Sequence, residues 1–125
     1  MKKDDLKNFI VLYDKFLEEC DRVACILKQA PEYKNDIEFA DKFVLEDDTV
    51  FWEGDEYWNY GGHEYHSGTF PAEYLTMSDE ELNKIVDTKI KEYEKREEEK
   101  KRLRREAEKA ARLKEYEKLK AEFGD

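Results

Sequence analysis

The apolar residues of this chain change their spacing after Pro31, and this change limits the folds that it can adopt. From Leu6 to Leu27 they recur at steps of three and four, which places them on one face of a helix. Pro31 lacks an amide donor and ends the pattern, so we expect a helix over residues 5–29. From Ile37 onward the step is two, the period of a strand with one exposed face. The sequence therefore predicts an α+β fold.

Turn residues divide the following segment into short strands. Asp47–Asp48 fit a turn, Gly54–Asp55 interrupt the alternation, and Gly61–Gly62 permit the positive φ of a tight turn. We therefore expect an antiparallel meander of four strands in an acidic sheet over residues 36–77. The N-terminal helix would pack across the apolar face of this small sheet.

A long second helix is expected to begin directly after Ser78. Ser78 and Glu81 fit a capping box, because the Ser hydroxyl can accept the Glu81 amide hydrogen while the Glu side chain accepts from the Ser78 amide. Apolar residues continue at helical spacing as far as Tyr93, so the start of this helix, residues 79–93, would share the core. Residues 1–93 are thus predicted to form a globular α+β head.

The rest of this helix has a different composition. Residues 94–102 have no apolar side chain, although pairs of Glu with Lys or Arg at i,i+4 favour a helix there. An irregular apolar stripe then runs from Leu103 to Phe123. We expect residues 94–125 to form a projecting charged helix that acts in oligomerisation or docking, and a homodimer through this helix is one alternative.

Negative charge is concentrated in the predicted sheet. Residues 36–80 contain thirteen Asp and Glu and one basic residue, Lys42, whereas the whole chain has a net charge of −10. Residues 1–35 are balanced, and residues 81–125 have a small excess of basic residues. Because self-repulsion opposes compaction, charge of one sign on a small sheet predicts a basic partner.

Acidic residues in this segment alternate with aromatic ones, and the two together form the predicted partner-binding face. Ten aromatic residues lie between residues 36 and 80, and most of them are expected in the core of the sheet. Some aromatic residues are adjacent in the sequence, and adjacent side chains of a strand point to opposite faces of the sheet. Some of these rings must therefore be exposed among carboxylates, as in a protein-binding hot spot. The residues assigned to this face are Asp47, Asp48, Glu53, Asp55, Glu56, Tyr57, Tyr60, Glu64 and Glu73.

The composition of the sheet disfavours direct binding of nucleic acid, because phosphate contacts need Lys and Arg. A carboxylate surface can instead occupy the basic groove of a nucleic-acid-binding protein, as a phosphate backbone would. The C-terminal helix differs, since residues 95–114 contain ten basic residues and five Glu. Arg102, Arg104 and Arg105 are candidates for docking nucleic acid or the acidic head of a second copy. The alternative is a solvated helix rich in charge.

Two histidines offer a metal site as an alternative hypothesis. His63 and His66, together with Glu53, Asp55 or Glu56, supply nitrogen and oxygen donors of the kind that a divalent ion uses. In a strand, however, His63 and His66 point to opposite faces, so we expect no metal and no cofactor. The chain has no nucleophile motif and no phosphate-binding loop, and we expect a protein that is not an enzyme.

Neither a leader sequence nor a membrane-spanning segment is predicted. The N-terminus leads directly into the first helix, and no stretch approaches about 18 uncharged apolar residues. Cys20 and Cys25 are spaced as neither a redox pair nor a zinc pair. We therefore expect a cytoplasmic protein with reduced cysteines.

Two short runs resemble small aromatic-rich proteins of uncharacterised function that bacteriophages encode. These runs are residues 54–62 (GDEYWNYGG) and residues 70–75 (FPAEYL), and the charged helix that follows residues 78–82 is similar as well. In size and acidity the chain is also similar to anti-CRISPR proteins, the phage inhibitors of host defence. Several of these bind the nucleic-acid groove of a Cas effector.

The resemblance and the acidic face together predict a non-enzymatic inhibitor or adaptor in the cytoplasm of a bacterial host cell. Its partner would be a basic nucleic-acid-binding protein of the host, for example a Cas effector. The alternative is a structural or assembly protein that oligomerises through its C-terminal helix.

Overall fold

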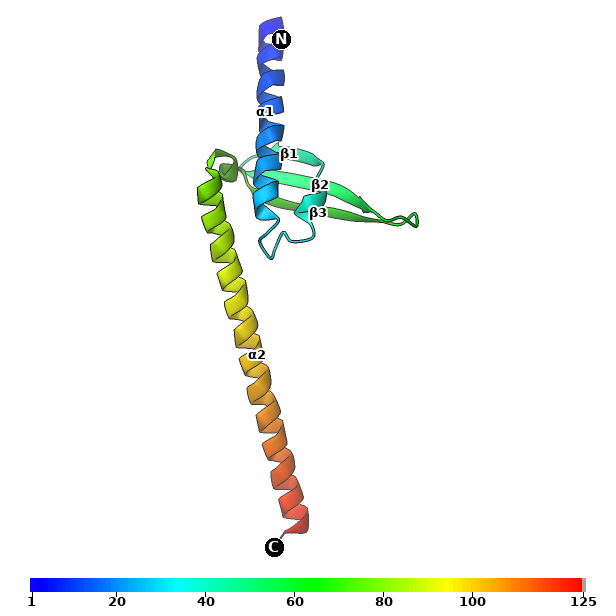
Figure 1. Ribbon diagram of the computed structural model, residues 1–125, viewed down its shortest axis with the longest axis vertical. Coiled ribbons are helices and arrows are strands. Elements are labelled where there is room, and N and C mark those ends of the chain that lie inside the picture. The colour runs from blue at the N-terminus through cyan, green and yellow to red at the C-terminus, as the bar shows by residue number, and fades with distance from the viewer. Residues whose placement is uncertain (125) are drawn as a thin grey trace. The chain divides into compact units, whose positions relative to one another are not determined.

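The computed structural model describes residues 1–124 and is α+β, with an N-terminal helix, a three-stranded antiparallel sheet and a long C-terminal helix (Figure 1). The elements are, in chain order, α1 (Lys3–Leu27), the 3₁₀ helix η1 (Ile37–Phe39), β1 (Lys42–Glu46), β2 (Thr49–Tyr57), β3 (His63–Pro71), the 3₁₀ helix η2 (Ala72–Thr76) and α2 (Asp79–Phe123). The chain forms two units, residues 1–90 and the part from Lys91 onward. The predicted α+β class is confirmed.

The core of residues 1–90 lies between the inner face of the sheet and the second half of α1, which runs across the strands (Figure 1). The buried side chains that form most of it are Cys20, Val23, Ala24 and Leu27 of α1, Phe43, Val50, Trp52 and Phe70 of the sheet, and Leu82 and Val86 of α2. Burial raises the pKa of the Cys20 thiol to about 12, whereas Cys25 is exposed, and both thiols are free. The second half of α1 and the start of α2 thus share one core with the sheet.

The first half of α1 lies outside this core, although its apolar stripe begins at Leu6. The large apolar side chains from Leu6 to Tyr13 are between 46% and 67% exposed. A helix of 25 residues is about 37 Å long, whereas the axes of three neighbouring strands span about 10 Å, so α1 is too long for the sheet to cover. Phe9, Leu12, Tyr13 and Phe16 line an open apolar groove of about 510 Å³ against β1.

The sheet has three strands in the order β1-β2-β3, so the prediction of four strands was wrong. Gly54 does not end a strand, because it lies inside β2 and pairs with His66 of β3. A Cβ at Gly54 would lie 1.7 Å from the carbonyl oxygen of Phe39, so the glycine permits η1 to pass directly against the sheet. The segment at Ile37, predicted as a strand, is η1 instead, and the buried Ile37 side chain joins the core.

The other two predicted turns are present. Asp47–Asp48 separate β1 from β2, and Asp47 has a φ of 52°, which Asp tolerates better than most residues. The loop at residues 58–62 joins β2 to β3, and Gly61 there has a φ of 85°. The Trp58 amide donates to the Gly62 carbonyl at 2.9 Å and closes this loop.

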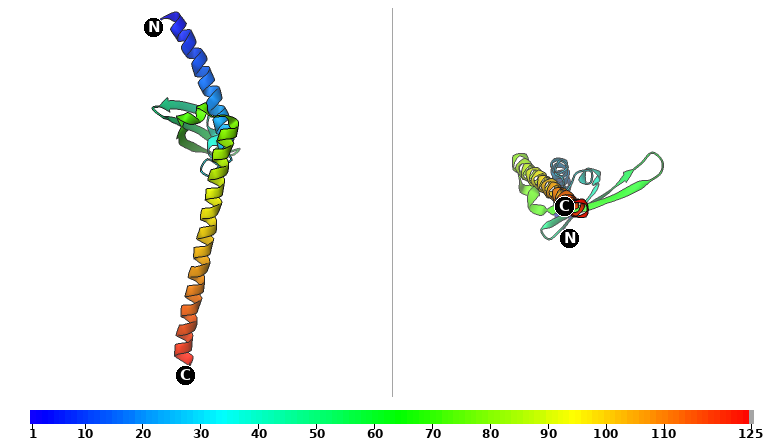
Figure 2. Two further views of the ribbon diagram at one scale, coloured as in Figure 1. Left: turned by 90° about the vertical axis from the view of Figure 1, so that its left-hand side faces the viewer. Right: turned by 90° about the horizontal axis from the view of Figure 1, so that it is seen from below.

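The β2–β3 hairpin is longer than the strand that pairs with it. The β1–β2 register ends at the pair Lys42–Glu53, whereas β2 and β3 remain paired as far as Tyr57 and His63. The hairpin therefore extends beyond β1 as a two-stranded arm, which both Figure 1 and Figure 2 show. Residues 54–66 are called the hairpin arm below.

One of the two hydrogen bonds of the predicted capping box is present at the start of α2. The Glu81 amide donates to Ser78 Oγ at 3.2 Å. Arg22 of α1 holds the same end of α2, because its guanidinium donates to the Asp79 carboxylate at 2.7 Å. This contact joins α1 to α2 beside the core.

The second unit consists of the rest of α2. Its described side chains are exposed, apart from the half-buried Glu97. Pairs one turn apart support the helix, among them Lys100 with Glu97 at 3.5 Å. The boundary between the units follows Ile90, whereas the sequence placed the end of the head at residue 93. Within residues 1–124, no helix combines the length and the apolar character that crossing a membrane requires.

Gly54→Ala is expected to lower the free energy of unfolding by about 2–3 kcal/mol, because the new Cβ would overlap a backbone atom and displace η1. Gly61→Asn is the matched control, since a Cβ at Gly61 meets no atom within 4 Å and Asn tolerates a positive φ. Urea unfolding followed by circular dichroism measures both variants. Equal stability of the two would contradict the role assigned to Gly54.

Candidate functional site

The hairpin arm has two faces of different chemistry, because side chains alternate along β2 and β3. The outer face, turned away from the core, carries the registered pairs Asp55–Tyr65 and Tyr57–His63, and Glu53 continues it at the base of the arm. The inner face carries the registered pairs Glu56–Glu64 and Gly54–His66. Each face is therefore a separate candidate site.

The predicted partner-binding residues do not form one surface. The structure places Glu53, Asp55 and Tyr57 on the outer face, Glu56 and Glu64 on the inner face, Tyr60 in the loop of the arm, and Asp47, Asp48 and Glu73 at the opposite end of the sheet. At that end the Ala72 amide donates to the Asp48 carbonyl at 2.7 Å, so the residue after Ala72, Glu73, lies near the β1–β2 turn. Two acidic groups thus lie at the two ends of the sheet.

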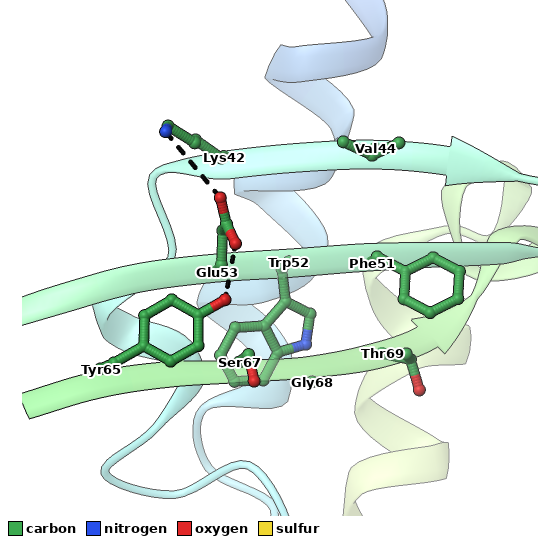
Figure 3. Close-up of a pocket in the computed structure, with 9 residues that line it drawn as sticks. All are labelled: Lys42, Val44, Phe51, Trp52, Glu53, Tyr65, Ser67, Gly68 and Thr69. Atoms are coloured by element: carbon green, nitrogen blue, oxygen red, sulfur yellow. Dashed lines mark hydrogen bonds and ion pairs between the residues drawn. The ribbon is translucent and has the colours of Figure 1, made fainter.

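The outer face combines exposed aromatic rings with carboxylates. Phe51, Tyr65 and Tyr57 are 44%, 57% and 76% exposed, although all three lie on strands. Figure 3 shows Phe51 and Tyr65 beside an open pocket of about 400 Å³ over the strands. Exposed aromatic side chains of this kind are enriched in protein-binding hot spots.

A row of polar contacts crosses this face from β1 to β3 (Figure 3). The Tyr65 hydroxyl donates to Glu53 Oε2 at 2.6 Å, and Lys42 Nζ lies 3.8 Å from Glu53 Oε1. The hydrogen bond to Glu53 raises the pKa of Tyr65 above its ordinary value. Lys42, the one basic residue of residues 36–80, is thus already next to a carboxylate.

The inner face of the arm holds a buried histidine. His66 is 8% exposed, and its Nδ1 lies 2.5 Å from Asp36 Oδ1. Phe39 of η1 stacks on the imidazole with ring centroids 4.7 Å apart. Asn35, with a φ of 63°, turns the chain immediately before Asp36. The loop before η1 and η1 itself therefore set the orientation of the His66 ring.

The second nitrogen of His66 faces two carboxylates. His66 Nε2 is buried without a hydrogen-bond partner, and it lies 3.4 Å from Glu56 Oε1 and 4.0 Å from Glu64 Oε2. Glu56 and Glu64 are registered partners, so two like charges meet here. The hydrogen bond to Asp36 raises the pKa of His66, burial opposes this rise, and Glu64 and Glu56 add to it.

The two histidines of the alternative metal hypothesis are on opposite faces. His63 is exposed on the outer face, where its ring lies 5.8 Å from that of Tyr57. Within residues 1–124, the group of three whose ligand atoms lie within 4.8 Å of one another is Glu56, Glu64 and His66. The structure therefore brings His66 together with carboxylates and not with His63.

The candidate basic docking residues lie on the second unit. Arg102, Arg104 and Arg105 are exposed on α2. Arg102 forms an ion pair with Glu99 and lies 3.9 Å from Glu106, so part of its charge is already paired within the helix.

Two site residues were missed from the sequence. Asp36 was treated as one acid among many, and no local pattern connects it to His66, which is 30 residues away. Tyr65 was counted among the ten aromatic residues, and its place on the outer face depends on the β2–β3 register, in which it pairs with Asp55.

No family model matches the chain, and no curated protein and no solved structure is significantly similar to it. The function must therefore be argued from the two faces of the hairpin arm. The resemblance to phage proteins stays a prediction.

Asp36→Asn is expected to lower the pKa of His66, because a neutral amide stabilises the imidazolium less than a carboxylate does. A raised folded-state pKa means that protonation of His66 stabilises the fold. This contribution is complete below the unfolded-state pKa of about 6.5 and is lost as the pH rises through the folded-state pKa. The variant should therefore lose more stability at about pH 5 than at about pH 9.

Urea unfolding in the presence of a chelator measures this difference, and an NMR titration of the imidazole protons reports the pKa of His66 directly. Glu38→Gln, an exposed residue of η1, removes the same charge without a contact to His66 and is the control. An identical loss of stability at both pH values would contradict the role assigned to Asp36.

Proposed function

We propose that this protein is a non-enzymatic binding protein whose outer hairpin face occupies a basic surface of a nucleic-acid-binding protein. One observation carries the proposal: Tyr57 and Tyr65 lie on the same face of the sheet as Glu53 and Asp55. The two Tyr side chains are 76% and 57% exposed. Packing of the core does not account for these rings, because they are exposed. Solubility does not account for them either, because exposed aromatic rings do not increase it. Their position is the one expected of a contact surface.

The charge of this face favours a basic partner. Residues 36–80 contain thirteen acids, and the single Lys42 is already next to Glu53. Arg side chains of a partner can form bidentate contacts with carboxylates and stack on Tyr rings. Both contacts are ones that Arg also makes with phosphates and bases. An Arg-rich groove of a partner can therefore make the same kinds of contact with the outer face as with a nucleic acid.

An inhibitor or adaptor is the function that fits such a face. The protein would compete with nucleic acid for its partner by steric and electrostatic means, and it would need no catalytic group. The predicted resemblance to phage proteins suggests an anti-CRISPR role, with a Cas effector as the partner in the cytoplasm of a bacterial host cell. The partner class, a basic nucleic-acid-binding protein, follows from the face itself.

The charge-reversal variant Asp55→Lys is expected to weaken partner binding by about tenfold or more at low salt, and by less at high salt, where exposed charges are screened. Asp87→Lys, at an exposed position of α2, changes the net charge equally and is the control. The partner is first captured from a bacterial lysate treated with nuclease. Displacement of a labelled nucleic acid from that purified partner then measures competition for each variant.

Two results would overturn the proposal. One is equal weakening by Asp55→Lys and Asp87→Lys, which would show that net charge and not the outer face matters. The other is a captured partner that keeps its nucleic acid when saturated with this protein.

A second function, that of an assembly protein, is favoured by the exposed apolar residues. The first half of α1 exposes Phe9 and Leu12 at 56% and 65%, and the distal part of α2 exposes Tyr116 and Phe123 at 63% and 84%. Exposed apolar patches commonly mark interfaces between chains. In this alternative, copies of the chain associate through these helices. The sheet then only caps the ends of the helices and binds no partner.

Truncation after Tyr93 separates the two functions, because the core residues all precede that position. A binding protein is expected to keep its partner affinity within about twofold, since the outer face is intact. An assembly protein that uses the distal helix is expected to lose both its oligomeric mass and its function. Light scattering over a range of concentrations measures the mass, and Leu12→Glu tests the contribution of α1 in the same way.

A further inference from the structure

We propose that His66, Glu56 and Glu64 bind a first-row divalent metal ion, of which Zn²⁺ is the probe, on the inner face of the hairpin arm. This site is distinct from the outer face and goes beyond the function proposed above. It also differs from the hypothesis of a site that joins His63 and His66, since these two histidines lie on opposite faces.

The first support is the unused nitrogen of a buried histidine. His66 is 8% exposed, and its Nε2 has no hydrogen-bond partner among the described residues. Glu56 Oε1 lies 3.4 Å and Glu64 Oε2 4.0 Å from this nitrogen. A buried polar atom normally finds a partner, so a nitrogen that faces two oxygens without bonding to them leaves room for a bound group.

The second support is the orientation of the imidazole. The Nδ1–H of neutral His66 can donate to Asp36 at 2.5 Å, which leaves the Nε2 lone pair toward the carboxylates. The stacked ring of Phe39 restricts rotation of the imidazole. A carboxylate behind a histidine is the arrangement that orients metal-binding histidines and raises their basicity. Asp36 is therefore a positioning residue and not a ligand.

The third support is the pair of facing carboxylates. Glu56 and Glu64 are directly opposed on paired strands, where like charges are destabilising unless a cation lies between them. Among the described residues, the recorded ion-pair contacts of Glu56 and Glu64 are with His66. A protonated His66 or a bound cation would therefore neutralise the pair locally.

The geometry fits a small cation with nitrogen and oxygen ligands. The three ligand atoms lie within 4.8 Å of one another, and bond lengths of about 2.0–2.2 Å require a small rotation of the Glu side chains to draw them closer. Glu64 is exposed and can rotate, whereas Glu56 Oε2 accepts a hydrogen bond from Trp58 Nε1 at 2.9 Å, which leaves Glu56 Oε1 toward His66. One imidazole with two carboxylates suits Zn²⁺ and its neighbours better than Mg²⁺ or Ca²⁺. Three ligands from the chain leave a fourth position for water or for a side chain of a partner.

The rival state is a proton on Nε2, with no metal. An imidazolium between Asp36, Glu56 and Glu64, stacked on Phe39, would use the same contacts. The two states compete, because a metal ion needs the Nε2 lone pair that the proton occupies. Metal affinity should therefore rise with pH, whereas a site that only holds a proton will bind no metal at any pH at which the protein is folded.

The full-length chain, freed of metal by a chelator, is titrated with Zn²⁺ alone by isothermal calorimetry at neutral pH. We expect one ion per chain with a dissociation constant in the micromolar range or below, and a change of the His66 Nε2 resonance in ¹⁵N NMR. Glu64→Gln is expected to weaken binding at least about tenfold, and Asp36→Asn by about 10–100-fold. Glu64 is exposed, so this variant keeps the fold, which circular dichroism verifies.

Two matched variants test where the ion is bound. Glu46→Gln removes an exposed acid from β1, and His63→Asn removes the other histidine. Both should bind Zn²⁺ like the wild type. The proposal is overturned if the wild type binds no stoichiometric Zn²⁺, if Glu64→Gln and Glu46→Gln bind equally well, or if His63→Asn abolishes binding. None of these outcomes changes the partner-binding test of the outer face.

Discussion

The close passage of the Phe39 carbonyl over Gly54 is the constraint on which the rest of the structure depends. A Cβ at Gly54 would lie 1.7 Å from this oxygen, so no other residue allows η1 to lie against the sheet in this way. With η1 in this position, Ile37 fills the core, Phe39 stacks on His66 and Asp36 reaches its Nδ1. One missing methyl group thus couples the packing of the loop to the chemistry of the inner face.

The alternation of the hairpin arm separates two kinds of negative charge. On the outer face, Glu53 and Asp55 stand among exposed rings, where a partner can reach them. On the inner face, Glu56 and Glu64 converge on a single buried nitrogen of His66, which has no hydrogen-bond partner among the described residues. An acidic segment that looks uniform in the sequence therefore supports two independent proposals. An ion on the inner face would also link β2 to β3 and restrain the arm that carries Tyr57.

The exposed apolar side of α1 is a consequence of the size of the sheet. Three strands cover only the second half of a helix of 25 residues, so Phe9 and Leu12 stay exposed beside β1. A fourth strand, as first predicted, would have widened the sheet on which the helix packs. The incorrect prediction that a strand ends at Gly54 added this fourth strand. With four strands, the exposed apolar side of α1 was not expected.

The sequence by itself determined the features that depend on neighbours along the chain. These are the helical period of α1, the Ser78 cap of α2, the turns at Asp47–Asp48 and Gly61–Gly62, and the concentration of acids in one segment. Only the tertiary structure decided that Gly54 continues a strand, because the reason lies in a backbone atom of Phe39, which is remote in sequence. It likewise decided which acids share a face and that Asp36 meets His66 across 30 residues, since a contact between distant segments leaves no local pattern to read.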